Sequence, residues 1–220
     1  MNRLIEAKGG FITVEGIEGV GKSTNIDTIQ QFLKERDIEC IVTREPGGTD
    51  LGEDIRGLLL GHKHSAMSSD CELLLMFASR AQHLSQVIMP ALEKGQWVIC
   101  DRFTDATYAY QGGGRGIPDK QIAILEEWVH GDQYSGDTWQ PDLTFLLDTD
   151  VATGMARVHQ RGAVDRFESE APTFFERVRA KYLERAKDNS RIAIIDAGLP
   201  LEDVIESLRQ RLTAFVESLE

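Results

Sequence analysis

The sequence contains few cysteines and no long apolar segment. Its three cysteines, Cys40, Cys71 and Cys100, are odd in number and lack the paired spacing of a metal site, and two lie in apolar runs typical of strands. We expect reduced thiols in the core. No stretch approaches the roughly 18 apolar residues of a membrane span, and the start, Met1–Glu6, lacks the apolar centre of a signal peptide. These absences favour a cytoplasmic protein.

Positive charge is also scarce. The chain has 24 lysines and arginines against 36 aspartates and glutamates, a formal net charge of -12 that would repel a polyanionic nucleic acid. We therefore expect no nucleic-acid partner, and a local site for any anionic ligand. The 220 residues, 41% of them hydrophobic, suffice for one sizeable core. No repeat, low-complexity tract or linker divides them, so we expect a single domain over residues 1–220.

Five short runs rich in branched apolar residues predict strands. They span Phe11–Glu15, Cys40–Arg44, Trp97–Asp101, Leu143–Asp148 and Ile192–Asp196. Their nearly continuous apolar character is typical of parallel strands covered on both faces. Helical patterns fill the intervals, so the sequence predicts a three-layer α/β fold, a five-stranded parallel sheet flanked by helices, with ligands at the carboxyl ends of the strands. Gly112–Gly114 and Gly131–Gln140 are expected to be irregular surface.

A glycine-rich motif follows the first predicted strand. Residues 16–23 read Gly-Ile-Glu-Gly-Val-Gly-Lys-Ser, the P-loop pattern, and lie between a predicted strand and a predicted helix. In such a loop backbone N–H groups surround phosphate oxygens, Lys22 reaches the β and γ phosphates, and the Ser23 hydroxyl binds Mg²⁺. The motif therefore predicts a P-loop NTPase fold that binds ATP. The residues expected at ATP are Gly16, Ile17, Glu18, Gly19, Val20, Gly21, Lys22, Ser23 and Thr24.

The loop alone does not define the phosphoryl acceptor, because switches, motors and kinases share it. Asp101 ends an apolar strand and suits a metal-ligating or orienting role, but Arg102 follows it directly. A cation beside the Mg²⁺ region indicates a second anionic group. Further arginines near strand ends or on helices that can border the cleft are Arg44, Arg56, Arg80 and Arg115. Guanidinium groups suit phosphates, so this set favours an acceptor that already carries a phosphate.

A segment after the fourth strand, about residues 150–168, is rich in arginine. Arg157 and Arg161 stand four residues apart, which places both on one face of a helix, and Gly162 can act as a hinge. We expect a lid that closes over ATP and excludes water. Arginines at a transferring phosphoryl group can raise the rate by roughly 10³ to 10⁵. An exposed basic helix is the alternative interpretation.

Together these motifs resemble the bacterial thymidylate kinases over essentially the whole chain. The signatures that carry the resemblance are Glu15–Thr24, Thr43–Thr49, Leu75–Arg80, Asp101–Phe103, Tyr110–Gly116 and the arginine-rich lid. The resemblance implies an ATP- and Mg²⁺-dependent phosphorylation of dTMP to dTDP, a step toward deoxythymidine triphosphate. It also implies a homodimer, packed through helices such as one around residues 71–89.

The same resemblance implies roles on the acceptor side. Arg80, Arg102 and Arg56 would hold the phosphate of dTMP. Phe77 would stack on thymine, and Thr107 would face the edge of the base. The full set expected at dTMP is Glu45, Pro46, Arg56, Phe77, Arg80, Arg102, Thr107, Tyr110 and Gln111.

Roles near the sugar and the metal follow from the resemblance as well. Tyr110 would crowd the 2′ position and so favour deoxyribose, and Glu18 would lie near the sugar and the metal. Ser23 and Asp101 are the residues expected at Mg²⁺.

The variable positions of the phosphate loop, residues 17–20, contain no arginine. Some family members carry a catalytic arginine there, so this chain resembles the form whose catalytic arginines lie in the lid. That favours Arg157 and Arg161 over Arg166. The residues expected to take part in catalysis are Lys22, Arg102, Arg157, Arg161, Glu18 and Asp101.

The expected mechanism is direct in-line transfer without a covalent enzyme intermediate. A phosphate acceptor is already anionic near neutral pH, so positioning replaces a general base. A deoxynucleoside kinase acting on thymidine is one alternative; it needs a carboxylate to activate the 5′ hydroxyl, for which Glu45 is the candidate, but it has no use for so many arginines. A non-catalytic nucleotide-binding switch is the other. It would carry a motif such as Asn-Lys-x-Asp, which this sequence lacks.

Overall fold

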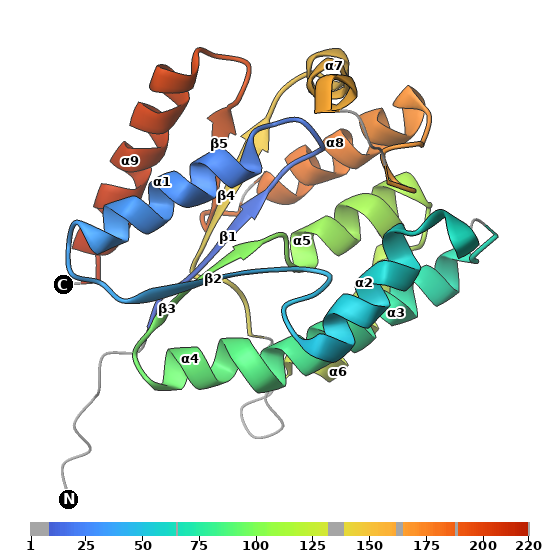
Figure 1. Ribbon diagram of the computed structural model, residues 1–220, viewed down its shortest axis with the longest axis horizontal. Coiled ribbons are helices and arrows are strands. Elements are labelled where there is room, and N and C mark those ends of the chain that lie inside the picture. Colours follow the sequence, from blue (N-terminus) through green and yellow to red (C-terminus); the bar gives the residue numbers. More distant parts are fainter. Residues whose placement is uncertain (1–8, 65, 132–138, 162–164, 188, 220) are drawn as a thin grey trace, which may run out of the picture.

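The computed structural model describes residues 9–64, 66–131, 139–161, 165–187 and 189–219. In this part of the chain, five parallel strands form one sheet in the order β2-β3-β1-β4-β5 (Figure 1). The strands are β1 (Phe11–Glu15), β2 (Cys40–Arg44), β3 (Trp97–Asp101), β4 (Leu143–Asp148) and β5 (Ile192–Asp196). The five predicted strands and the α/β fold class are confirmed.

Helices cover both faces of the sheet and complete the three layers. α1 (Lys22–Lys34) and α9 (Leu201–Glu217) pack side by side on one face (Figure 1). On the other face, α4 (Met89–Glu93) packs on β3, and α8 (Pro172–Ala186) packs on β4 and β5. The other α-helices of the described residues are α2 (Asp50–Leu60), α3 (Ser69–His83), α5 (Thr104–Thr107), α6 (Asp119–His130) and α7 (Val151–Arg161).

Three short helical segments join or extend these helices. η1 (His62–His64) is a 3₁₀ turn after α2, and η2 (Leu84–Ile88) is a π-helical segment that joins α3 to α4. η3 (Tyr108–Gly114) is a second π-helical segment, which continues α5. Segments of π-helix occur frequently at functional sites, and η3 carries two of the residues expected at dTMP.

The core is divided by the alternation of side chains along the central strands. Trp97 and Ile99 of β3 belong to a buried cluster shared with α1 and α9, whereas Val98 and Cys100 pack with apolar residues of η2 and α4. Successive side chains of a strand point to opposite faces, so one strand supports both layers. Each large apolar side chain buried in this way contributes roughly 1.5–3 kcal/mol to stability. This double packing fixes the carboxyl ends of β1, β3 and β4, where the predicted site lies.

Complete coverage of every strand was a wrong expectation. β2 is only partly buried, and Val42 is 44% exposed. β2 is an edge strand of the five-stranded sheet, so it has a hydrogen-bonded neighbour on one side alone. Continuous apolar character therefore identified the strand but not its exposure.

The expectation of irregular surface at Gly112–Gly114 was also wrong, because these glycines belong to η3 and two of them are buried. A Cβ on Gly114 would lie 2.5 Å from a ring carbon of Phe174. The absence of side chains allows η3 to pack against α8. Of the other expected surface stretch, residues 132–138 lie outside the described residues.

The cysteines follow the expectation only in part. All three are free: Cys100 is buried, Cys40 is partly buried, and Cys71 is exposed in the first turn of α3. The prediction of a core thiol is therefore wrong for Cys71. Within the described residues, no helix combines the length and apolar character needed to cross a membrane.

Candidate active site

The phosphate loop connects the carboxyl end of β1 to α1, as its sequence context predicts. Two glycines are required by geometry. Gly19 has a φ of 76°, and a Cβ there would lie 2.0 Å from the carbonyl oxygen of Gly154 in α7. Gly21 precedes α1 in the left-handed conformation, with a φ of 85°. The loop therefore presents the amino end of α1 to the strand ends, the arrangement that binds phosphate.

Lys22 is folded back on this loop. Its Nζ donates to the carbonyl oxygens of Ile17, at 3.2 Å, and Gly16, at 3.5 Å. Burial, followed by the nearby charge of Arg102, lowers the pKa of Lys22 to about 8. A polyanion bound beside this group would favour its charged form and raise its pKa again.

Arg102 lies at the centre of the site, immediately after β3. Its φ of 70° is in the left-handed region, which non-glycine residues adopt rarely and mostly at functional positions. Its guanidinium group donates to the carbonyl oxygen of Gly16 at 2.6 Å and to Glu18 at 3.0 Å. It also lies over the ring of Tyr110, 4.9 Å from the centroid. Arg102 therefore ties β3 to the phosphate loop.

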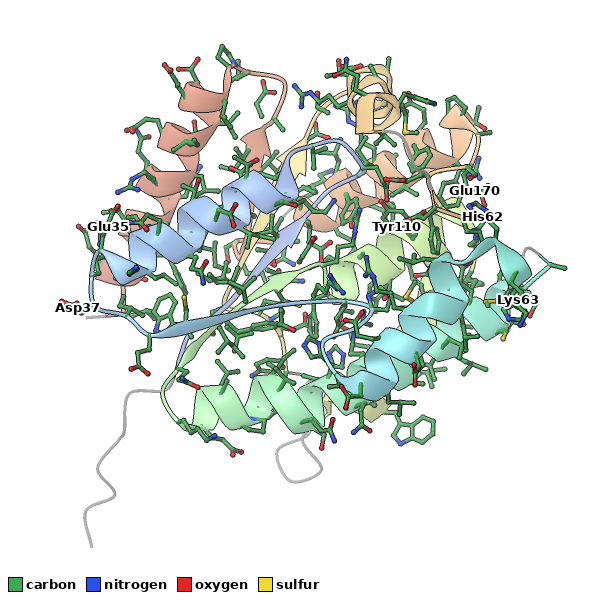
Figure 2. All side chains as sticks on the ribbon, in the orientation of Figure 1. Glu35, Asp37, His62, Lys63, Tyr110 and Glu170 are labelled. Atoms are coloured by element: carbon green, nitrogen blue, oxygen red, sulfur yellow. The ribbon has the colours of Figure 1, made fainter. Side chains whose placement is uncertain are left out.

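Glu18 and Tyr110 complete this centre. The Tyr110 hydroxyl lies 2.7 and 2.8 Å from the two carboxylate oxygens of Glu18. Figure 2 shows the side chain of Tyr110 within the molecule, whereas Glu35 lies at its edge. Burial, then the charge of Glu18 and its hydrogen bond, raise the pKa of Tyr110 well above its usual value against the opposing effect of Arg102. Tyr110 therefore remains a hydrogen-bond donor.

A buried carboxylate that sequence reasoning did not assign lies beneath Arg102. Glu15, the last residue of β1, is fully buried and accepts hydrogen bonds from the backbone N–H of Phe103 at 2.7 Å and the hydroxyl of Tyr182 at 2.8 Å. Tyr182 in turn accepts from Arg102 at 3.2 Å. Burial and the neighbouring Asp105 raise the pKa of Glu15 to about 7. A charged residue ending an apolar strand was the available sequence signal.

Several of the residues predicted at the acceptor nucleotide contact Arg80 of α3. Arg80 is 2% exposed, and its Nε donates to Glu45 at 2.7 Å. One terminal nitrogen donates to Thr107 at 2.9 Å, while the other is buried and has no hydrogen-bond partner among the described residues. Unpaired buried polar groups are rare in proteins, and this nitrogen is available to donate to a ligand in the cavity.

The other acceptor-side residues differ in where they point. Arg56 lines a cavity that it shares with the phosphate loop, called the cavity below, and donates to the carbonyl oxygen of Pro46 at 2.8 Å. Gln111 also lines it and donates to Glu72 at 2.9 Å. Phe77 is 3% exposed, packs against the guanidinium group of Arg80 at 4.9 Å, and does not line the cavity. Its expected stacking on a base stays a prediction.

Arg44 and Arg115 do not border the cavity within the described part of the chain. Arg44 is exposed and forms an ion pair with Glu53, and Arg115 forms ion pairs with Glu72 and Glu170. Neither arginine therefore lines this cavity, and Arg44 instead lines a second pocket with Ser23 and Asp101. The ion pairs of Arg115 join segments distant in sequence, which spacing alone does not reveal.

Ser23 and Asp101 both line the cavity, and their oxygens fit a hard divalent cation. Oδ1 of Asp101 is buried and lacks a hydrogen-bond partner among the described residues. Those residues contain no group of three acidic, histidine or cysteine side chains able to hold a metal by themselves. This donor set suits Mg²⁺, which usually takes one or two protein ligands plus phosphate oxygens and water.

The lid segment reaches the phosphate loop. Arg157 of α7 lines the cavity and donates to the carbonyl oxygens of Gly19 at 3.3 Å and Ala197 at 3.1 Å. The side chain of Arg161 and the expected hinge Gly162 lie outside the described residues. Arg166 is buried and donates to Glu72 at 2.6 Å and to the carbonyl oxygen of Leu59. It is held by α2 and α3 rather than by the phosphate loop.

One cavity of about 500 Å³ gathers most of the predicted site. The residues that were predicted from the sequence and that line it are Glu18, Gly19, Gly21, Lys22, Ser23, Thr24, Glu45, Pro46, Arg56, Arg80, Asp101, Arg102, Thr107, Tyr110, Gln111 and Arg157. Gly16, Ile17, Val20 and Phe77 were predicted and do not line it. Lining residues not assigned beforehand are Leu60, Met76, Phe103, Ala106, Asp165, Phe167 and Glu168. Most of the added residues are apolar, and a sequence pattern does not distinguish them from core.

Comparisons with known proteins agree on one family. The thymidylate kinase family profile matches residues 14–208. The thymidylate kinase of Pseudomonas savastanoi pv. phaseolicola is 53% identical over 210 residues, covering 95% of this chain and 97% of that protein. The thymidylate kinases of Teredinibacter turnerae and Nitrosomonas eutropha are 52% and 51% identical, over 94% and 97% of this chain and 99% and 93% of their own lengths.

Proposed function

This chain belongs to the thymidylate kinase family, and we propose that it transfers the terminal phosphoryl group of ATP to dTMP to form dTDP. The observation that carries the proposal is the single cavity in which Lys22 of the phosphate loop faces the same space as Arg56, Arg80 and Arg102. An overall charge of -12 makes such a local cluster of cations notable. Two phosphate-bearing substrates would meet there.

On the donor side, the phosphate loop and the lid divide the work. Backbone N–H groups of the loop and the amino end of α1 hold the β and γ phosphates. Lys22 binds their oxygens, and Arg157 reaches the loop from α7. We propose that Arg157, with Arg161, neutralises the charge that develops on the transferring group.

On the acceptor side, guanidinium groups bind the phosphate of dTMP and polar side chains orient the nucleoside. Arg102 is held in place by Glu18 and by the carbonyl oxygen of Gly16. Such preorganisation is the source of most electrostatic catalysis. Tyr110 closes the space beside the sugar, and Thr107 reads the base edge.

Ser23 and Asp101 would hold Mg²⁺ in this proposal. When bound, the ion supplies Lewis-acid stabilisation of phosphate oxygens. The acceptor phosphate attacks in line, a bond forms between its oxygen and the γ phosphorus, and the bond from that phosphorus to the β,γ-bridging oxygen of ATP breaks. The protein residues need only bind and orient the two groups, because the nucleophile is already an anion.

The alternative of a kinase for free thymidine is not favoured. It requires Glu45 as general base. Both oxygens of Glu45 are engaged, one by Arg80 and one by His83. Although burial opposes ionisation, the charge of Arg80 and the hydrogen bond from His83 hold the pKa of Glu45 below its usual value. A carboxylate so stabilised is a poor base.

The proposal is tested by ADP release from ATP and Mg²⁺ with dTMP, dUMP, UMP, dCMP, AMP, GMP and thymidine as acceptors. We expect dTMP to be preferred. Slower turnover of dUMP is expected because the thymine methyl contributes about 1–3 kcal/mol, or roughly 10 to 200-fold. Removing Mg²⁺ with EDTA should abolish turnover, and adding it back should restore it. Turnover of thymidine would show that the acceptor is the nucleoside rather than the monophosphate. The absence of any acceptor-dependent turnover would contradict a kinase.

We further propose that the enzyme acts in the cytoplasm as a homodimer. The helix expected at the interface, α3, carries Leu74 at 56% exposure, and the adjacent α2 carries Leu58 at 42%. Exposed leucines on adjacent helices are suited to a subunit contact. Light scattering after size-exclusion chromatography should give twice the chain mass of 24.6 kDa. A Leu74→Glu variant should give the monomer mass if α3 forms the interface.

A further inference from the structure

A continuous line of hydrogen bonds runs from β2 to the acceptor side of the cavity. It begins at the Thr43 hydroxyl, 2.6 Å from Nε2 of His83. Nδ1 of His83 lies 3.0 Å from Oε1 of Glu45, and the other oxygen of Glu45 accepts from Nε of Arg80 at 2.7 Å. Arg80 then donates to Thr107 at 2.9 Å. Thr43 and His83 lie outside the cavity lining, whereas the last three members belong to it.

The partners of His83 define its hydrogen positions. A carboxylate is only an acceptor, so Nδ1 must carry hydrogen and donate to Glu45. Nε2 then accepts from the Thr43 hydroxyl in the neutral ring or donates to it in the charged ring. In either state both ring nitrogens are satisfied, and the ring is fully buried. His83 therefore has one orientation available.

The surroundings leave His83 no room to move. It is the last residue of α3 and directly precedes the π-helical segment η2. Gly48 lies against the ring with a φ of 79°, and a Cβ there would be 2.5 Å from Nε2. The backbone of Gly48 thus packs closely against the His83 ring and restricts its orientation. The hydrogen bond from this ring in turn restricts the Glu45 carboxylate.

Glu45 passes this constraint to Arg80. The guanidinium group of Arg80 lies over two aromatic rings, 4.9 Å from the centroid of Phe77 and 5.1 Å from that of Phe103. The rings restrict it to a plane, and the bond from Glu45 selects its rotation within that plane. What remains is the one terminal nitrogen that has no partner among the described residues.

We propose that His83 is a positioning residue for the acceptor nucleotide, which it orients through Glu45 and Arg80. The inference rests on the proposed binding of dTMP at Arg80. His83 itself touches no substrate and takes no part in phosphoryl transfer. Its role is to hold the Glu45 carboxylate so that the unpaired nitrogen of Arg80 is already directed at the acceptor when dTMP binds. Such preorganisation strengthens binding by lowering the cost of ordering.

The test compares three substitutions that divide the two hydrogen bonds of the ring. His83→Asn places an amide nitrogen at the position of Nδ1 and keeps a donor toward Glu45. His83→Gln places one at the position of Nε2 and keeps only the contact with Thr43. His83→Leu removes both. For wild type and each variant, dTMP and ATP dissociation constants are measured by calorimetry, together with kcat and the melting temperature.

We expect His83→Leu and His83→Gln to weaken dTMP binding about tenfold, the equivalent of about 1.4 kcal/mol, with ATP binding unchanged. His83→Asn should recover most of the dTMP affinity. Thr43→Val, which keeps the shape of Thr43 but removes its hydroxyl, should produce a smaller loss of the same kind.

Several outcomes would overturn the inference. Equal dTMP affinity in His83→Asn and His83→Gln would show that the donor toward Glu45 is unimportant. Parallel losses of dTMP and ATP binding that follow the melting temperature would show a purely structural role. If His83→Leu does not fold, the Asn and Gln pair decides the question. Failure of the wild-type protein to bind dTMP would instead refute the proposed function.

Discussion

The hydroxyl of Tyr110 and the carboxylate of Glu18, which both line the cavity, are in contact with oxygen–oxygen distances of 2.7 and 2.8 Å. Glu18 simultaneously accepts from Arg102 at 3.0 Å. The residue expected to exclude a ribose hydroxyl is therefore hydrogen-bonded to the carboxylate that holds Arg102, the arginine proposed to bind phosphate. In the proposed function, sugar selection and phosphate binding would share one hydrogen-bonded unit.

The two functions of Tyr110 can be separated by substitution. Tyr110→Phe keeps the ring but removes the hydrogen bond from the Tyr110 hydroxyl to Glu18. We therefore expect turnover of dTMP to fall roughly tenfold. The preference for dTMP over its ribose counterpart should be retained. Tyr110→Leu should lose that preference. The ratio of kcat/KM values for the two acceptors measures the effect. A loss of preference in Tyr110→Phe equal to that in Tyr110→Leu would assign selection to the hydroxyl.

Lys22→Ala should leave the fold intact and reduce kcat by at least the roughly 10² to 10³ that one lost transition-state donor costs. Circular dichroism checks the fold, and single-turnover kinetics measures the chemical step. Lys22→Arg, which keeps the charge on a differently shaped group, serves as the control. Substantial turnover in Lys22→Ala would remove Lys22 from the catalytic set.

The lowered pKa of Lys22 also predicts a pH dependence of ATP binding. The free protein has this pKa near 8, and a bound polyphosphate favours the charged form. Above pH 8 the side chain of Lys22 is mostly a neutral amine, which must take up a proton as ATP binds, so ATP affinity should fall by up to about tenfold per pH unit. Calorimetry in two buffers of different ionisation enthalpy measures this uptake. Lys22→Arg should bind ATP with little change in affinity between about pH 7.5 and about pH 9.5, because the arginine side chain stays charged throughout this range.

Arg157 should act on the rate and little on substrate affinity. Its position against the loop carbonyl of Gly19 places it beside the phosphate loop, where the donor phosphates are proposed to bind. We expect Arg157→Ala to lower kcat by roughly 10² or more with a change in the KM for dTMP of less than about threefold. Arg161→Ala, measured in parallel, determines which lid arginine contributes more. An unchanged kcat in both variants would contradict a catalytic lid.

Glu15 should make stability depend on pH. Its folded pKa of about 7 is raised above the usual 4.5, so the folded state binds more protons than the unfolded state between these values. Its contribution is fully present below pH 4.5 and is lost as pH rises through 7, a change on the order of 1–3 kcal/mol. Glu15→Gln keeps the shape and cannot ionise. The melting temperature of Glu15→Gln minus that of wild type should therefore be more positive at pH 8 than at pH 5.

Matched variants guard this prediction against other titrating groups. Tyr182→Phe removes one hydrogen bond of Glu15 but leaves the carboxyl group in place, so a pH-dependent difference from wild type should persist in Glu15→Gln and be smaller in Tyr182→Phe. A melting-temperature difference between Glu15→Gln and wild type that is constant from pH 5 to 8 would contradict the assignment.

The sequence determined the five strands and the position of the phosphate loop. All five strands lie within the predicted bounds because branched apolar runs bounded by polar residues favour parallel strands. The phosphate loop was readable because its chemistry depends on residues adjacent in the chain, such as Gly21 and Lys22. A local motif carries its own geometry, since few backbone conformations satisfy it.

Only the tertiary structure decided the rest of the site. Tyr182 and His83 show no local pattern, and the only local signal of Glu15 is its place at the end of an apolar strand. The contacts of these residues join positions that are 38 to 167 apart in sequence. The positions of Arg80 and Arg115 in the sequence did not separate them, and only the family resemblance favoured Arg80. In the structure Arg80 lines the cavity, whereas Arg115 forms ion pairs with Glu72 and Glu170. Burial and long-range pairing set which charges remain available to a ligand, and these are properties of the packed chain rather than of any segment.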